Sequence, residues 1–309
     1  MASNVYLCPT KMTLRQLLGC SILCLSSNAL ATADQGAIVV RDDAGLTVTL
    51  TKPAQRIISL SPAETEMLFA AGGDGHIVGV IRYSDFPEAA NHLPVVGDAQ
   101  GLDIERIVSL KPDLIVVWYE GNTKSHVEQL RQLGIPLFFG QPRHLEDIPG
   151  SILTLGELMG THAQAAQAAT QLSFQLNALK QKYQQRSPVR MFYQVWDQPL
   201  FTLSGQHIVS DAIQLCGGVN IFAGLKTVSP TVDIEAVLRL DPEAVVGTDE
   251  KNPGDGGVQM WKRYPTLQAV KRDNLFLIDG NLINRAGPRM IAGATELCEK
   301  LDQARTKRR

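Results

Sequence analysis

The segment DIERIVSLKPDLIVV, residues 103–117, decides the fold, because DIEAVLRLDPEAVVG at residues 233–247 repeats its pattern 130 residues later. Each copy begins with Asp-Ile-Glu, continues through a turn that contains proline, and ends in an apolar run. An unbroken apolar run is typical of a strand that is buried on both faces of a parallel sheet. Each copy therefore predicts a short helix, a turn and a buried strand.

The segments on either side of the two copies also correspond. Glu66–Ala71 and Asp211–Cys216 each read as the end of a helix, and each is followed by two glycines. Pro136–Phe139 and Leu275–Ile278 each read as the next strand of a sheet. Strands that alternate with helices predict an α/β fold with two similar lobes, each built on a mostly parallel sheet. Ligands of such sheets bind outside the carboxyl ends of the strands, so we expect a ligand cleft between the lobes.

A helical span without any strand pattern separates the two halves. Thr161 and Gln164 form a capping-box pattern that predicts the start of a helix from about His162 to Gln185, roughly 35 Å long. Its apolar stripe consists of Ala169, Leu172, Leu176, Leu179 and Tyr183. One long helix joining two lobes predicts a small opening motion rather than a wide hinge. The expected divisions are an N-terminal lobe at 37–150, a connecting helical segment at 151–186 and a C-terminal lobe at 187–304.

Residues 1–31 read as a secretory signal peptide. Two basic residues precede a short apolar core at Leu17–Leu25, and small residues suited to cleavage follow it. Translation could start at Met1 or at Met12. The sequence therefore predicts an exported protein.

Removal of the signal peptide changes the cysteine content. Cys8, Cys20 and Cys24 leave with the signal, and only Cys216 and Cys298 remain. Two cysteines in an exported chain favour one disulfide bond, and the alternative is a pair of unrelated buried thiols.

Composition and missing motifs exclude several classes of protein. The net charge is −2, which gives no electrostatic reason to expect nucleic-acid binding, and no apolar run is long enough to span a bilayer. The six histidines are scattered without the spacing of metal ligands. The nucleophile elbow, the zinc-protease motif and the dinucleotide fingerprint are all missing from the sequence. We therefore expect neither an enzyme nor a metal carrier.

The chain resembles the helix-linked periplasmic substrate-binding proteins of ABC importers, and among them most closely the cobalamin (vitamin B12) binders. The matching segments are Arg56–Glu66, Tyr83–Pro87, Gly101–Ile107, Leu110–Leu114, Cys216–Phe222 and Arg285–Arg289. The resemblance implies a periplasmic protein without a cofactor that carries a corrinoid to a permease dimer and its two ATPase subunits. A monomer is expected for the free protein.

A set of ligand-binding residues is expected, of which Tyr83 and Trp118 match positions that line the corrinoid cleft in the family. Trp196 follows a predicted strand of the second lobe, and Arg285 is the cation of the last cleft loop. Ser61, Pro62 and Ala63 start a helix whose free N–H groups could receive ligand amides; plain helix initiation is the alternative there, and core packing is the alternative for Trp118. A flat aromatic face suits a large macrocycle, because it buries apolar area with little loss of side-chain entropy. The chain departs from the family where Ala99 and Ser229 stand in place of tryptophans and Asn281 in place of an acid. The last change is expected to leave Arg285 without its likely carboxylate partner, so that Arg285 donates to ligand amides or to a phosphate; a surface ion pair is the alternative.

Glu105 and Glu235 occupy equivalent positions in the two repeats, so one lies on each lobe. In the family these glutamates dock to arginines of the two permease subunits, where opposite charges steer and orient the encounter. A simpler interpretation is that each glutamate stabilises the first turn of its own helix.

Two other functions stay open. One is capture of haem or of a ferric siderophore, with Tyr83 as a possible iron ligand. The other is a secreted α/β enzyme, which the missing motifs disfavour.

Overall fold

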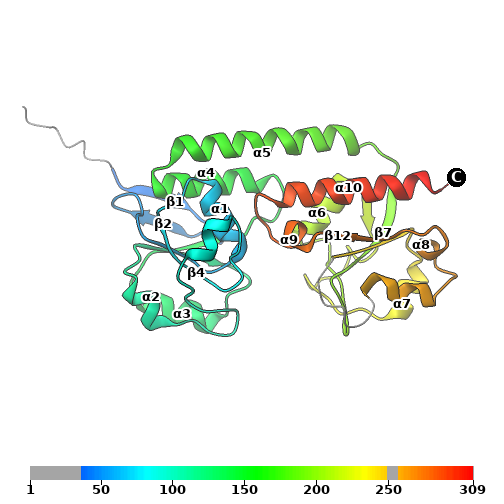
Figure 1. Cartoon of the computed structure of the whole chain (residues 1–309), viewed down its shortest axis with the longest axis horizontal. Coiled ribbons are helices and arrows are strands. Elements are labelled where there is room, and N and C mark those ends of the chain that lie inside the picture. Colours follow the sequence, from blue (N-terminus) through cyan, green and yellow to red (C-terminus); the bar gives the residue numbers. More distant parts are fainter. Residues whose placement is uncertain (1–35, 249–256, 309) are drawn as a thin grey trace, which may run out of the picture. The chain divides into compact units, whose positions relative to one another are not determined.

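Both copies of the repeated segment fold as predicted, into a helix, a turn and a buried strand. The first copy gives α2 (Ile104–Ser109) and β5 (Leu114–Trp118), and the second gives α7 (Ile234–Leu240) and β11 (Ala244–Thr248). Both strands lie inside four-stranded sheets in which every pairing is parallel. The predicted α/β fold with two similar lobes is therefore confirmed (Figure 1).

The structure is a computed structural model that describes residues 36–248 and 257–308. The expected signal peptide at residues 1–31 and both candidate start residues lie outside the described residues.

The first sheet has the strand order β4-β3-β5-β6 and is preceded by the antiparallel pair β1–β2. The other elements of this lobe are β1 (Ile38–Arg41), β2 (Thr47–Leu50), β3 (Ile57–Ser59), α1 (Pro62–Ala70), β4 (Ile77–Val80), the 3-10 helix η1 (Glu88–His92), α3 (Lys124–Gln132) and β6 (Leu137–Gly140).

The second sheet has the order β10-β7-β11-β12, so its strands follow the same pattern of positions. The other elements of this lobe are β7 (Val189–Gln194), β8 (Trp196–Asp197), β9 (Leu200–Phe201), α6 (Ile208–Leu215), β10 (Gly218–Asn220), the 3-10 helix η2 (Gly257–Arg263), α8 (Gln268–Lys271), β12 (Leu275–Ile278), α9 (Gly280–Ile283) and α10 (Met290–Thr306).

The turn between helix and strand has the same backbone geometry in both lobes. Lys111 has φ +49° and Asp241, 130 residues later, has φ +44°, a region that residues other than glycine seldom adopt. In each lobe an arginine side chain, from Arg56 or Arg190, donates to the carbonyl oxygen of the residue just before this one, at 2.7 and 2.6 Å. The internal repeat thus extends to individual hydrogen bonds.

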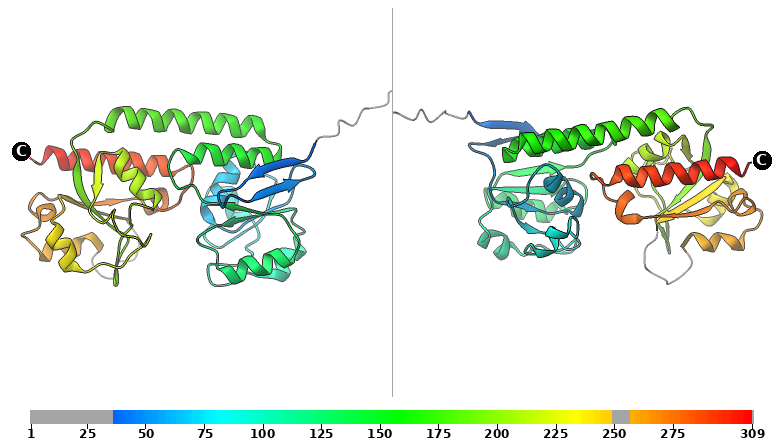
Figure 2. Two further views of the ribbon diagram at one scale, coloured as in Figure 1. Left: turned by 180° about the vertical axis from the view of Figure 1, so that it is seen from behind. Right: turned by 45° about the horizontal axis from the view of Figure 1, so that its top comes forward.

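Two helices lead from the first lobe to the second, α4 (Asp147–Met159) and α5 (His162–Tyr183). They pack closely, because a Cβ atom on Gly156 would lie 2.3 Å from that of Ala165. From α4 and α1, α5 runs on to contact α6 and α10 of the second lobe (Figures 1 and 2). The predicted connecting helix is therefore present. None of the helices in the described residues is long and apolar enough to cross a membrane.

The capping box predicted at the start of α5 does not form. Thr161 precedes the helix, but its side chain makes no cap hydrogen bond. Its hydroxyl group donates instead to the carbonyl oxygen of Ala71, at 2.6 Å, just beyond the end of α1. The hydroxyl therefore ties α5 to the first lobe rather than to its own helix.

Cys216 and Cys298 form the expected disulfide bond. Cys216 ends α6 and Cys298 lies within α10, and both residues are fully buried. The bond fixes α10 to α6 inside the second lobe.

Candidate functional site

A cavity of about 220 Å³ lies between the lobes, within roughly 870 Å³ of empty space that opens to solvent. The first lobe lines it with the start of α1 and with residues that follow β5 and β6, and the second lobe with the start of α6 and the loop before α10. A second cavity of about 520 Å³ shares Arg143, Gln206 and His207 with the first. The cleft thus lies beside the carboxyl ends of the strands, where α/β sheets bind ligands.

Three of the predicted ligand-binding residues open α1, and all three line the cavity. They are Ser61, Pro62 and Ala63. Proline at the first helical position has no N–H group to leave unpaired, and the Ser61 side chain accepts a hydrogen bond of 3.2 Å from the backbone N–H of Glu64. The first turn of α1 is therefore well fixed at the cleft wall.

The predicted aromatic residues have different surroundings. Trp118 ends β5, lines the cavity and is 46% exposed. Tyr83 and Trp196 line neither of the two cavities above, and they are 74% and 39% exposed. Tyr83 also has φ +70°, a strained conformation for a bulky residue and one that recurs at functional sites. Of the three, only Trp118 contributes to the cavity wall.

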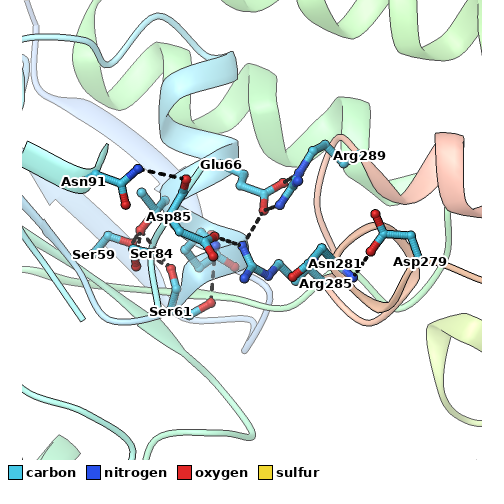
Figure 3. Close-up of polar contacts among 12 residues, drawn as sticks. Ser59, Ser61, Glu66, Ser84, Asp85, Asn91, Asp279, Asn281, Arg285 and Arg289 are labelled. Atoms are coloured by element: carbon cyan, nitrogen blue, oxygen red, sulfur yellow. Dashed lines mark hydrogen bonds and ion pairs between the residues drawn. The ribbon is translucent and has the colours of Figure 1, made fainter. Parts of the chain in front are cut away.

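Arg285 has carboxylate partners, although the residue at the family's acidic position is Asn281; the ion-pair alternative holds, and the pair lies between the lobes rather than on the surface. The Arg285 guanidinium group donates to Asp85 at 2.6 Å and to Glu66 at 3.2 Å, and both carboxylates belong to the other lobe (Figure 3). Asn281, the residue at the family's acidic position, is exposed, and its backbone N–H bonds to Asp279. The hydrogen bond from Arg285 lowers the pKa of Asp85 below its ordinary value.

Arg289 adds a second link between the lobes. It donates two hydrogen bonds to the Glu66 carboxylate, at 2.6 and 2.9 Å, and its guanidinium group lies 4.0 Å from the centre of the Phe86 ring. The Glu66 side chain is only 1% exposed and that of Arg289 is 20% exposed, so the carboxylate of this ion pair is shielded from water. Figure 3 shows the contacts between the two lobes. We name the set Glu66, Asp85, Arg285 and Arg289 the interlobe cluster.

Glu120, Gln141 and Arg143 are among the polar residues of the cavity wall that were not found from the sequence. Glu120 accepts hydrogen bonds from Gln141, at 2.8 Å, and from Arg143, at 3.0 Å. Glu120 follows β5, and the other two residues follow β6. Their place after the carboxyl ends of predicted parallel strands was the signal that could have found them.

Two further titratable side chains line the cavity: Glu64 is buried, and His207 is half-buried. Burial, followed by repulsion from Asp43, raises the pKa of Glu64 to about 8. Burial lowers the pKa of His207 to about 4, and its ring accepts a hydrogen bond from the N–H of Val209 at the start of α6. Near neutral pH both side chains are therefore uncharged.

The proposed docking residues lie at matching exposed positions. Glu105 and Glu235 are each the second residue of their helix, in α2 and α7. Ala99 and Ser229, where the family has tryptophans, are also exposed. Among the described residues, no group of three or more acidic, histidine or cysteine side chains could hold a metal ion.

Two parallel-sheet lobes that are joined by a long helix and enclose a cleft define a helix-linked substrate-binding protein. Residues 57–282 match the family model described as periplasmic binding protein, and the chain belongs to this family.

The proteins that are similar to this chain include vitamin B12-binding proteins. The chain is 38% identical to the vitamin B12-binding protein of Yersinia pestis (strain Pestoides F) over 255 residues, which cover 82% of this chain and 89% of that protein. It is 35% identical to the crystal structure of the periplasmic vitamin B12 binding protein BtuF of Vibrio cholerae, with a TM-score of 0.76 and coverage of 82% and 98%.

More distant structures share the fold alone. The periplasmic haem binding protein HutB of Vibrio cholerae is 22% identical, with a TM-score of 0.69, and covers 80% of this chain and 98% of its own.

Proposed function

We propose that the chain captures cobalamin or a related corrinoid between its lobes and delivers it to an ABC permease in the periplasm, without catalysing a reaction. The observation that carries this proposal is the identity of 35–38% to two vitamin B12-binding proteins over 82% of the chain. The haem-binding protein HutB is too distant in sequence to support haem as the ligand of this chain. No cofactor takes part, since the corrinoid is the cargo.

The cleft supports this assignment through the combination of groups at its wall. Trp118 offers an exposed aromatic face, and the first turn of α1 offers backbone groups to the amides of a corrinoid. A ligand larger than the cavity would place one edge inside it and lie against the aromatic residues outside, among them Tyr83 and Trp196. Arg285 then contributes by holding the lobes at the right spacing as well as by contacting the ligand.

Isothermal titration calorimetry with cyanocobalamin, cobinamide and haemin tests the proposal. We expect binding of the corrinoids and no heat from haemin. Replacing Trp118 by Ala should weaken cyanocobalamin binding by about 1–3 kcal/mol, because an apolar face of the macrocycle would lose its cover. Binding of haemin with a change in its Soret band, and none of cyanocobalamin, would establish the haem alternative instead.

Glu105 and Glu235 are proposed to contact the two subunits of the permease dimer. The double variant Glu105→Lys/Glu235→Lys should bind cyanocobalamin as the wild type does, yet fail to stimulate ATP hydrolysis by the reconstituted transporter. Glu299→Lys is the matched control, because Glu299 is exposed on α10, on the other side of the second sheet from α7 (Figure 1). Stimulation that survives the double variant would refute the docking role.

A further inference from the structure

The carboxyl group of Glu64 is held in an unusual position at the cleft wall. Glu64 is the third residue of α1, is 2% exposed and lines the cavity. Its carboxyl group lies against the backbone of Gly140, where a Cβ atom would be 2.2 Å from the nearer oxygen. Any residue larger than glycine at position 140 would therefore displace this carboxyl group.

Within the described part of the chain, no side chain or backbone N–H forms a hydrogen bond with the Glu64 carboxyl group. The charge that raises its pKa further is that of Asp43, whose side chain accepts a hydrogen bond from the N–H of Gln141, next to Gly140. Ionisation of an acid that is buried, repelled by a second acid and bonded to no donor of the described residues costs free energy.

The cations of the cleft have other partners. Arg143 pairs with Glu120 at 3.0 Å, and Arg285 pairs with Asp85 and Glu66. His207, on the opposite wall, is neutral at physiological pH. Glu64 is therefore a neutral carboxylic acid at physiological pH that faces the cleft without a hydrogen-bond partner among residues 36–248 and 257–308, and its pKa of about 8 follows from this setting.

A neutral carboxylic acid has one O–H donor and one carbonyl acceptor side by side. A primary carboxamide presents the complementary pair, a carbonyl acceptor and an N–H donor. A carboxylate such as the propionate of haem presents acceptors alone, so the acid carbonyl would face a like partial charge. The site thus matches an amide better than an acid.

We propose that Glu64, held in place by the space at Gly140, binds a primary carboxamide of the ligand through a pair of hydrogen bonds and so selects macrocycles that carry amides over those that carry carboxylates. This inference rests on the proposed function, since corrinoids carry primary amides on the ring. Glu64 is then a specificity-determining residue of the cleft.

The test is calorimetric titration with cyanocobalamin between pH 6.5 and pH 9.5. The wild type should bind about tenfold more weakly at pH 9 than at pH 7, because ionised Glu64 loses its donor. Glu64→Gln, which keeps a donor and an acceptor, should bind at pH 7 within about twofold of the wild type and show no such loss. Glu64→Ala and Gly140→Ala should both bind weakly at every pH, and circular dichroism checks their folding.

Glu128→Gln serves as the control, because Glu128 is exposed on α3 and should leave the pH profile of the wild type unchanged. A wild-type affinity that is constant to pH 9.5 would overturn the inference while leaving the proposed function intact, and it requires no variant to fold. The same conclusion follows if Glu64→Ala folds and binds as the wild type does. If the wild type does not bind cyanocobalamin at all, the proposed function is refuted, and so is this inference.

Discussion

Two side chains on opposite walls of the cleft, Glu64 and His207, change the stability of the fold with pH in opposite directions. Glu64 has a raised pKa, so the folded state holds a proton that the unfolded chain releases, and stability falls as pH rises from 4.5 to about 8. His207 has a lowered pKa, so the unfolded chain takes up a proton that the folded state refuses. Stability therefore falls as pH drops from 6.5 to about 4.

The acid sensitivity from His207 can be removed without loss of the helix cap. Asparagine is a good N-cap residue, so His207→Asn should keep an acceptor for the N–H of Val209 and lose the ionisable ring. We expect the wild type to lose roughly 1 kcal/mol per pH unit more than the variant between pH 6.5 and 4.5. Urea denaturation at three pH values measures this, and parallel profiles would contradict the assignment.

At this scale the sequence revealed which residues face the cleft better than what they contact there. Ser61 and Trp118 line the cavity because each adjoins a strand or helix end that the apolar pattern located. Arg285 was assigned no partner, because Glu66 lies 219 residues away and its burial depends on how the lobes meet. The sequence around Glu64 gives no sign that folding buries its carboxyl group away from water.

At the scale of secondary-structure elements, the repeated helix and strand could be predicted because each strand is a continuous apolar run. Such a run is typical of a strand that is buried on both faces of a parallel sheet. β5 and β11 are buried along their first four residues. The helix α5 starts at His162 as predicted, but its capping box could not be judged from the sequence, since the Thr161 hydroxyl donates to the carbonyl oxygen of Ala71, which no local pattern reveals. Local pairing rules fail where a tertiary partner competes for the same group.

The disulfide bond between α6 and α10 should contribute strongly to the stability of the second lobe. It closes a loop with a sequence separation of 82, which restricts the unfolded chain and is worth up to about 4–5 kcal/mol in the chain-entropy model. The double variant Cys216→Ala/Cys298→Ala should lower the free energy of unfolding by a large part of that amount. Guanidinium denaturation measures the change. A midpoint that is the same with and without reductant would show that the bond adds little, and free thiols in the unfolded, unreduced protein would show that it had not formed.

At the scale of the whole described unit, the interlobe cluster is a polar contact that joins the two lobes beside the cleft. The Glu66 side chain is 1% exposed, and its carboxylate pairs with both Arg289 and Arg285. Arg289→Ala should therefore lower the free energy of unfolding by about 3 kcal/mol, because a buried carboxylate loses a bidentate partner. Adding Glu66→Gln should recover part of this loss, since the uncompensated charge is gone.

Arg131→Ala is the matched control, because Arg131 pairs with Glu128 on the surface and should change stability by less than about 1 kcal/mol. Small-angle X-ray scattering adds a readout of the lobes themselves, and the radius of gyration should increase in Arg289→Ala. Equal effects of Arg289→Ala alone and in the Glu66→Gln background would show that the two residues are not coupled.

The long separation in sequence within the interlobe cluster bears on the order of events during biosynthesis. Glu66 emerges from the ribosome more than two hundred residues before Arg285 and Arg289. Until those arginines arrive, a nascent first lobe must keep the Glu66 carboxylate in contact with water, with its α1 helix less firmly packed. A growing chain of this design therefore completes its first half only when its last segment has been made, and proteases or chaperones that meet it earlier would encounter that helix in a looser state.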